Sequence, residues 1–476
     1  MHPSLLSLNG SKSALSHVSE RQTSPLRRIA STLVACILPS LSWAQTQVPA
    51  ELLGHAILPA NTMLQPPADV PRDAMVSGKF TGPGNLRVDS PGTIMGRTGP
   101  EPQGRETGLS LPFNGQPLQG FSSMKNAGNG DWWLLTDNGF GNQKNSPDAL
   151  LMWHRARPDF TTGKVAIKTT TFLRDPDGKI PFRITYQGTG ERYLTGADLD
   201  VESLVVIGET VWLGDEFGPY LIRADLSGRV TGFFETDLAG RRLRAPEHHS
   251  LQMPATPAVV AFEVPRSGGF EGMSATPDGS RIWAMLEKPL LDANGKPEGR
   301  FLHVLAFDPA AARWTGESVK YALEKEATAI GDLNMIDATR ALVIERDDGQ
   351  GDPARACAPG NNPPNCFENP ARYKRVYVVD FSQVDAKGFA KKLSYIDLMN
   401  IQDPKSLARQ TGDRGEGQEG RFTFPFFTIE TVAMVDASTI MVGNDNNLPF
   451  SAGRFLHRPD DSEFILLRVP ELLSAP

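Results

Sequence analysis

The stretch GGFEGMSATPDGSRIWAMLEKPLL, residues 268–291, decides the fold of this chain. Glu271 precedes a run of small and apolar residues, and Pro277-Asp278-Gly279 is a turn signal. A second run, RIWAML, follows the turn and ends at Glu287-Lys288. Two short apolar runs separated by a turn predict a β-hairpin, and here an acidic residue stands at each end of it.

The same order recurs along the chain. Its most compact copy, DVESLVVIGETVWLGDEFGPYLIRADLSGRVTGFFE, begins at Asp200 and contains four strand-like runs. Further copies begin at Gly120, Ile330 and Phe427. A four-stranded unit repeated at this spacing predicts an all-β fold, namely a β-propeller with four-stranded antiparallel blades around a central channel.

The number of blades depends on the N-terminal region. The copies number five, and residues 48–112 are expected to supply a further blade. The copy that begins at Phe427 shows only three strands, so an N-terminal strand is expected to complete it and to remove the open sheet edges. We therefore favour six blades, with seven as the alternative. A pair of β-sandwiches would not repeat the order of strands and acids, and a β-helix would have a shorter period.

Residues 1–44 have the pattern of a signal peptide. Paired arginines precede the apolar run IASTLVACILPSL, and SWA, ending at Ala44, is a small-x-small cleavage signal. The run is too short to span a bilayer. We expect cleavage near Ala44, a mature domain over residues 45–476 without a transmembrane segment, and a periplasmic or secreted protein. Lipoprotein anchoring at Cys36 is the less favoured alternative.

The composition is that of a soluble globular protein, with 39% hydrophobic and 22% charged residues. A formal net charge of −7 provides no basic stripe for phosphates, which argues against a nucleic-acid partner. Cleavage would leave Cys357 and Cys366, and in an oxidising compartment this pair suggests a disulfide across the loop CAPGNNPPNC. We expect a monomer.

The acids at the ends of the strand-like runs are the candidate site. In a propeller the innermost strands line the channel, so equivalent acids from different blades converge. Carboxylates crowded there repel one another, and Ca²⁺, which prefers oxygen ligands, relieves that repulsion. The alternative is that each acid only accepts backbone N–H groups in its own turn. The leading set is Glu202, Glu271 and Glu430, with Asp332 as a further candidate, and the trailing set is Asp137, Asp215-Glu216, Glu287-Lys288, Glu345-Arg346 and Asp445.

The segments FEGMSATPDGSRIWAMLEKP, DVESLVVIGETVWLGDEFGPYL and TIETVAMVDASTIMVGNDNN resemble the phytase-like propeller domain described as "esterase-like activity of phytase". That domain is distantly similar to the calcium-dependent β-propeller phytases. The resemblance runs from Gly120 to Val469 and implies an exported propeller with Ca²⁺-assisted hydrolysis of phosphate esters. By position it pairs Glu271 with Glu287, Glu202 with Asp215, and Glu430 with Asp445. The chain has no clear counterpart of the acidic calcium-binding run near the start of true phytases, which puts phytate as the substrate in doubt.

Two functions follow as hypotheses. The first is a metal-dependent hydrolase of phosphate esters or other esters, with a small-molecule substrate. Its catalytic residues would be Glu271, Glu287, Lys288 and Arg346, and its calcium ligands Glu202, Asp215, Glu271, Glu287, Glu345, Glu430 and Asp445. The second is a non-catalytic, calcium-stabilised propeller that binds a peptide, glycan or lipid, and a lactonase-like metal propeller is a third option. The sequence has no G-x-S-x-G elbow and no H-E-x-x-H motif. The adjacent His248 and His249 are expected to be solvated loop residues, with a metal-binding role as the less favoured alternative.

Overall fold

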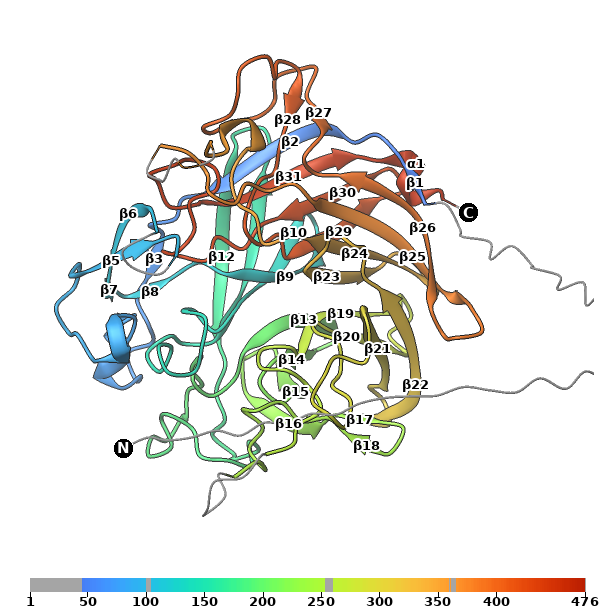
Figure 1. Cartoon of the computed structure of the whole chain (residues 1–476). Coiled ribbons are helices and arrows are strands. Elements are labelled where there is room, and N and C mark those ends of the chain that lie inside the picture. Colours follow the sequence, from blue (N-terminus) through green and yellow to red (C-terminus); the bar gives the residue numbers. More distant parts are fainter. Residues whose placement is uncertain (1–44, 100–103, 253–259, 359, 361–364, 476) are drawn as a thin grey trace, which may run out of the picture. The chain divides into compact units, whose positions relative to one another are not determined.

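The computed structural model describes residues 45–99, 104–252, 260–358, 360 and 365–475. The predicted signal peptide, residues 1–44, lies outside these ranges. Almost all regular structure in the described residues is β (Figure 1). The helical segments among them are the single-turn α1 (Pro470–Leu473) and the 3-10 turns at Arg72–Met75, Pro83–Asn85 and Pro353–Arg355. Within the same residues, no helix has the length and apolarity to cross a bilayer.

Five sets of four antiparallel strands account for most of the described strands. We call each set a blade, and its four strands follow one another in order from the innermost outward, except that the last blade takes its outer strand from the N-terminal region. The blades are β9–β12 (Phe121–Gly128, Asp131–Thr136, Met152–Asp159, Lys164–Phe172), β13–β16 (Val201–Ile207, Thr210–Asp215, Tyr220–Asp225, Val230–Glu235), β19–β22 (Phe270–Ala275, Ile282–Leu286, Phe301–Asp308, Arg313–Ala322), β23–β26 (Ala329–Met335, Arg340–Arg346, Lys374–Val384, Ala390–Asp397), and β29–β31 (Thr431–Asp436, Thr439–Gly443, Ser462–Arg468) with β2 (Glu51–Leu58).

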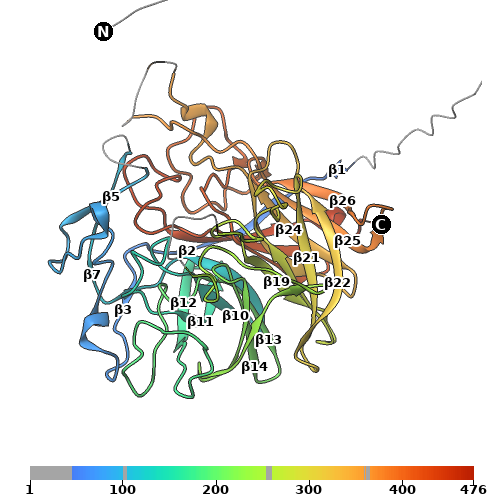
Figure 2. The ribbon, with the colours of Figure 1, turned by 60° about the horizontal axis from the view of Figure 1, so that its bottom comes forward.

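The prediction that an N-terminal strand completes the last blade is confirmed. Strand β2 pairs antiparallel with β31, from Glu51 opposite Arg468 to Leu58 opposite Ser462. A second N-terminal strand, β1 (Thr46–Gln47), pairs parallel with β26, and Figure 2 shows it along that strand. Residues 46–58 are therefore paired with the two blades that come last along the chain.

The further blade expected from residues 48–112 is not formed. Beyond β2 the described part of this region contains only two-residue to six-residue strands in ribbons, which lie to one side of the blades (Figure 1). The region is rich in proline, which cannot donate to a strand ladder, so longer pairing is interrupted. The ribbons are β3 (Met63–Leu64) with β8 (Gln116–Pro117), β4 (Val76–Ser77) with β7 (Phe113–Asn114), and β5 (Ile94–Arg97) with β6 (Glu106–Leu111).

Short ribbons also occur between the blades. They are β17 (Asp237–Leu238) with β18 (Arg241–Arg242), and β27 (Ile401–Gln402) with β28 (Arg421–Phe422). The insertion at 347–372 carries a disulfide between Cys357 and Cys366, which confirms the predicted pairing.

The first strands of the blades lie next to one another and are tied by side-chain hydrogen bonds (Figure 1). Ser123 Oγ accepts from the backbone N–H of Leu204, joining β9 to β13. Asn334 of β23 donates to the carbonyl of Val432 in β29 and to that of Met124 in β9. An apolar core fills the space between each blade and the next, including the last and the first. The fold is therefore propeller-like, with the start of every first strand at a shared centre.

Candidate functional site

A β-bulge near the start of the first strand recurs from blade to blade. In the register with the second strand, the extra residue is Ser122 in β9, Glu202 in β13, Glu271 in β19 and Gly331 in β23. Glu430 directly precedes β29. A bulge redirects a side chain out of the regular alternation, so these positions point a side chain away from the interblade core.

The second strand of each blade supplies a second residue. Thr136, Asp215, Leu286 and Glu345 pair with the residue just before the bulge. The residue that follows each of them is Asp137, Glu216, Glu287 and Arg346, and Asp445 follows β30 closely in the last blade. Register thus brings one bulge residue and one strand-end residue from each of the first four blades toward the same place.

The side chains at these positions form a buried acidic cluster. Glu216, Glu271 and Glu287 offer carboxylate oxygens that lie within 4.8 Å of one another. Glu271 is only 4% exposed and Glu287 9% exposed. Three different blade elements, the β14 end, the β19 bulge and the β20 end, therefore meet in one group of carboxylates.

Burial and mutual repulsion raise the pKa values of these carboxyl groups. For Glu271 burial is the main cause, followed by Glu430 and Glu287, and its pKa is well above the ordinary value. The pKa of Glu216 is raised by burial and then by Glu287, and that of Glu202 by burial and then by Asp200. Burial raises the pKa of Glu430 to about 8, with Asp445 as the next cause. The cluster therefore holds more negative charge than its surroundings stabilise.

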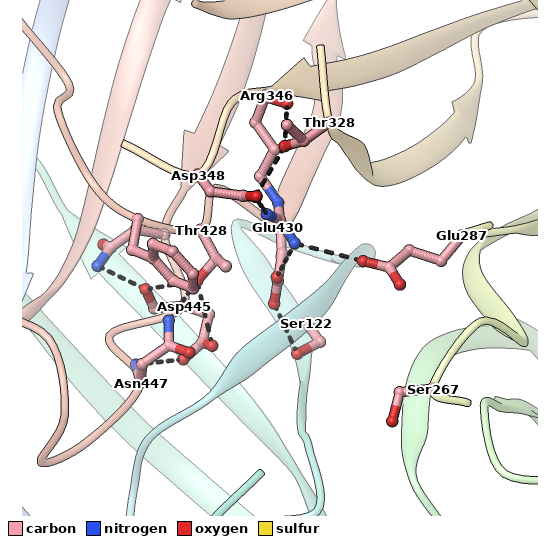
Figure 3. A network of polar contacts seen from close by, with 12 residues as sticks. Ser122, Ser267, Glu287, Thr328, Arg346, Asp348, Thr428, Glu430, Asp445 and Asn447 are labelled. Carbon is pink, nitrogen blue, oxygen red and sulfur yellow. Dashed lines mark hydrogen bonds and ion pairs between the residues drawn. The ribbon is translucent and has the colours of Figure 1, made fainter. Parts of the chain in front are cut away.

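Arg346 is the cation at the middle of the cluster (Figure 3). Its Nη2 lies 3.5 Å from Glu287 Oε1 and 3.5 Å from Glu430 Oε1. Its Nη1 lies 3.4 Å from Asp348 Oδ1. Burial alone would lower the pKa of Arg346, but Glu430 and Glu287 outweigh burial and raise it. Arg346 is thus fixed in its charged form between carboxylates of two blades.

Lys288 is a second and more exposed cation. Its Nζ lies 3.0 Å from Glu287 Oε2 and donates to the carbonyl groups of Arg266 and Ser267. Its side chain is 40% exposed, so it stands at the solvent side of Glu287, whereas the Arg346 side chain is 7% exposed. Each cation therefore contacts a different oxygen of Glu287.

Asp445 and Glu430 form the part of the cluster contributed by the last blade. Asp445 accepts from the backbone N–H of Asn447 at 2.7 Å and from Thr428 Oγ1 at 3.3 Å (Figure 3). Ser122 Oγ donates to Glu430 Oε2 at 3.2 Å, which connects the bulge of β9 to this blade. Burial raises the pKa of Asp445 to about 6.

The structure does not bring Glu345, a predicted metal ligand, to the acidic cluster. Its carboxylate is wholly buried on the other side of β24, where it accepts from Tyr321 and forms an ion pair with Lys392. Successive residues of a strand point to opposite faces, so Arg346 and not Glu345 reaches the cluster. Asp332 is likewise displaced by one position, because the bulge falls on Gly331.

Asp215 also points away from the unpaired carboxylates. Its oxygens accept from the backbone N–H of Asp200 at 2.8 Å and of Gly218 at 2.7 Å. Those bonds tie down its own turn, which was the structural alternative for each acid. Glu216, the next residue, provides the carboxylate beside Glu271 and Glu287.

Asp200 is a cluster member that the sequence did not single out. It is 3% exposed, and burial raises its pKa to about 6. Its charge acts on Glu202, Asp215 and Glu216. The feature of the sequence that could have identified Asp200 is its position two residues before Glu202, directly before β13 begins.

The donor set fits a hard divalent cation. Three buried oxygens of the cluster have no hydrogen-bond partner among the described residues, namely Asp200 Oδ1, Glu216 Oε1 and Glu271 Oε1. Leaving such oxygens without partners is unfavourable, and Ca²⁺ takes six to eight oxygen ligands. Glu216, Glu271 and Glu287 offer carboxylate oxygens and no histidine or cysteine stands among them, which favours calcium over zinc.

A cavity of about 310 Å³ adjoins the last blade's part of the cluster. Its lining includes Phe427, which Arg346 overlies at 6.0 Å, and Asn447, which holds Asp445. Phe450 and Arg97 complete a wall that is partly apolar and partly basic. A larger cavity of about 720 Å³ is lined by residues of 260–263 and 291–298 and by none of the cluster residues.

Comparison with known proteins gives one family match. The family model "Phytase-like: Esterase-like activity of phytase" matches residues 116–448. No curated protein matches the chain.

Several solved structures show weak likeness. Hydrazine synthase of Kuenenia stuttgartiensis is 8% identical over 72% of this chain and 67% of its own, with a TM-score of 0.26. A putative 6-phosphogluconolactonase from Bacteroides fragilis is 13% identical over 77% of this chain and 95% of its own, with a TM-score of 0.28. A luciferin-regenerating enzyme is 8% identical over 74% and 92%, with a TM-score of 0.29. At these scores the likeness supports no functional argument.

Proposed function

The chain belongs to the phytase-like family, and from that membership and the buried acidic cluster we propose that it is a calcium-dependent hydrolase of phosphate esters or other esters. The observation that carries the proposal is the convergence of Glu216, Glu271 and Glu287 within 4.8 Å, with buried oxygens that lack partners. The proposal includes a propeller ring whose blades surround this cluster.

In this proposal Asp200, Glu202, Glu216, Glu271, Glu287, Glu430 and Asp445 are the residues available to hold Ca²⁺. A bound divalent cation supplies Lewis acidity toward an ester oxygen and makes water more acidic. The chain's own contribution is to gather the carboxylates from rigid strand ends and to exclude bulk water from them. Asp215, which the sequence suggested as a ligand, has a positioning role in this proposal: it fixes the turn that presents Glu216.

Arg346 and Lys288 supply the positive charge of the site. Arg346 is held in place by Glu287 and Glu430, so its guanidinium is positioned before a substrate arrives. A preorganised cation stabilises negative charge that develops on a phosphoryl or acyl group. The partly apolar cavity lined by Phe427 and Phe450 would take the part of the ester that does not react.

The proposal also covers the substrate class, the oligomeric state and the localisation. The substrate is a small molecule, the protein is a monomer, and it acts in the periplasm or outside the cell after cleavage near Ala44. The disulfide between Cys357 and Cys366 accords with an oxidising compartment.

The test is a panel of chromogenic phosphate and carboxylate esters, assayed with Ca²⁺ and with a chelator. Glu271→Gln combined with Glu287→Gln should lower turnover by on the order of 10²-fold or more, because two converging carboxylates lose their charge. The control is Glu326→Gln, which neutralises an exposed glutamate outside the cluster. Full activity in the double variant would refute the site.

The same panel distinguishes the hydrolase from the second hypothesis, a non-catalytic protein stabilised by calcium. Turnover that the chelator abolishes while far-UV circular dichroism is unchanged supports a hydrolase. A fold that melts on chelation, without any turnover beforehand, supports a non-catalytic protein in which calcium is structural.

A further inference from the structure

A second cluster of side chains of the types that can bind metal lies on the outer part of the β13–β16 blade. Glu235, the last residue of β16, faces His248 and His249 of the following insertion. The carboxylate and imidazole atoms of these three residues lie within 4.8 Å of one another. Glu235 Oε1 is 3.4 Å from His249 Nε2 and 3.9 Å from His248 Nε2. Both ring nitrogens therefore lie near the same carboxylate oxygen.

The histidines are held in this orientation by packing. The sequence predicted solvated loop residues, and the structure differs. The side chain of His248 is 0% exposed and that of His249 is 22% exposed. The two rings are stacked, with centroids 4.8 Å apart and planes inclined by 19°. Phe182 stacks on His249 at 5.5 Å, so the pair is packed between aromatic groups.

Hydroxyl groups occupy the other nitrogen of each ring. His249 Nδ1 is 2.9 Å from the Tyr220 hydroxyl, and His248 Nδ1 is 2.9 Å from Ser250 Oγ. Outer partners of this kind fix ring orientation in metal sites. His248 Nε2 is left buried without a hydrogen-bond partner among the described residues. A bound metal ion would give this buried nitrogen, which lies near a carboxylate and a second imidazole, the partner that it lacks.

We propose that Glu235, His248 and His249 form a site for a borderline divalent transition metal, with Zn²⁺ as the preferred ion. Two imidazoles and one carboxylate suit Zn²⁺, whereas Ca²⁺ takes oxygen ligands, so this site and the acidic cluster select different ions. Ligand atoms around a tetrahedral zinc ion lie roughly 3.3 Å apart. The spacing to His249 fits this value and the spacing to His248 needs an inward movement of about half an ångström.

The ligand atoms are available to a metal, because His248 Nε2 has no hydrogen-bond partner among the described residues and Glu235 Oε1 is not the oxygen paired with Arg242. Metal at Nε2 places the ring proton on Nδ1, where Ser250 Oγ accepts it. The backbone N–H of Ser250, now 3.2 Å from Nδ1, would then turn away. Arg242 pairs with Glu235 Oε2 at 3.2 Å and leaves Oε1 to the histidines.

Three protein ligands leave one position of a tetrahedral ion for water or an external ligand. The site joins the end of an outer strand to the insertion after it, and none of its ligands belongs to the acidic cluster. The ion would thus fasten His248 and His249 to the end of β16.

The test is titration of the purified, metal-free protein with Zn²⁺ in the presence of excess Ca²⁺, followed by calorimetry, and with Co²⁺, followed by visible absorption. We expect one ion per chain with the absorption of a tetrahedral cobalt site, and a higher melting temperature with Zn²⁺. His249→Gln and Glu235→Gln should each weaken binding at least ten-fold. Both side chains are partly exposed, so these variants are expected to cost less stability than a change of the buried His248.

The matched control is His303→Gln. His303 Nε2 lies 3.4 Å from Glu298 Oε2, so it is another histidine beside a glutamate, on the next blade. Binding should be unchanged in this variant. Circular dichroism of the metal-free variants shows whether each is folded. Zn²⁺ affinity that is the same in folded His249→Gln as in the original protein, or an absence of stoichiometric binding, would overturn the proposal.

Discussion

At the scale of single residues, one position along a strand decides which acid serves the site. Glu345 and Arg346 are neighbours in sequence, yet one is paired with Lys392 on one face of β24 and the other lies among the carboxylates. Asp215 and Glu216 differ in the same way. A repeated acidic pair in the sequence therefore locates the site to within two residues, and the register of the hairpin selects between them.

Arg346 gives a prediction at this scale. Arg346→Gln removes the buried cation between Glu287 and Glu430, so in the presence of a chelator the free energy of unfolding should fall by about 3–5 kcal/mol. Urea unfolding measures this change. Added Ca²⁺ should recover part of the loss, because it supplies positive charge to the same carboxylates. A loss that is equal with and without Ca²⁺ would contradict calcium binding beside Arg346.

At the scale of elements, the pairing of β2 with β31 depends on a buried charged group. His55 Nε2 lies 2.9 Å from Glu463 Oε2, and Arg454 Nη2 lies 2.6 Å from the same oxygen. Burial alone would raise the pKa of Glu463, but Arg454 and His55 outweigh burial and lower it to about 2. The N-terminal strand is thus held by a carboxylate that stays charged in mildly acidic solution.

This group predicts how acid affects the N-terminal strand. The folded-state pKa of Glu463 is depressed, so its contribution is present above the unfolded value of 4.5 and is lost as pH falls toward about 2. The contribution amounts to about 3 kcal/mol. Glu463→Gln should remove it and flatten that part of the pH dependence in urea unfolding. Glu51→Gln, at the other end of β2 and paired with Lys405 at the surface, should keep the original profile.

At the scale of the whole molecule, the acidic cluster opposes folding when no cation is bound. The pKa of Glu430 is about 8, mainly because of burial and next because of Asp445, so the folded protein holds a proton that the unfolded chain releases. Between about pH 4.5 and pH 8 the metal-free protein should become less stable as pH rises, which is opposite in sign to the effect of Glu463.

Melting temperatures at about pH 5 and about pH 8 test this, with chelator and with Ca²⁺. With chelator the melting temperature should be lower at the higher pH. With Ca²⁺ the difference should shrink or reverse, because the cation binds the deprotonated carboxylates. A metal-free protein that is more stable at about pH 8 would show that the carboxylates do not crowd a common centre.

The sequence by itself determined the repeated strand and acid order, the all-β class, the completion of the last blade by an N-terminal strand, and the convergence of Glu271 with Glu287. These follow from local patterns, since turn residues and alternation act over a few residues. Only the tertiary structure decided that the described residues between β2 and β9 form ribbons, that Glu216 and Arg346 rather than Asp215 and Glu345 reach the acidic cluster, and that Asp200 and His248 are buried. Those outcomes depend on bulges, on register and on packing between distant segments, and a one-residue shift in register reverses every side chain.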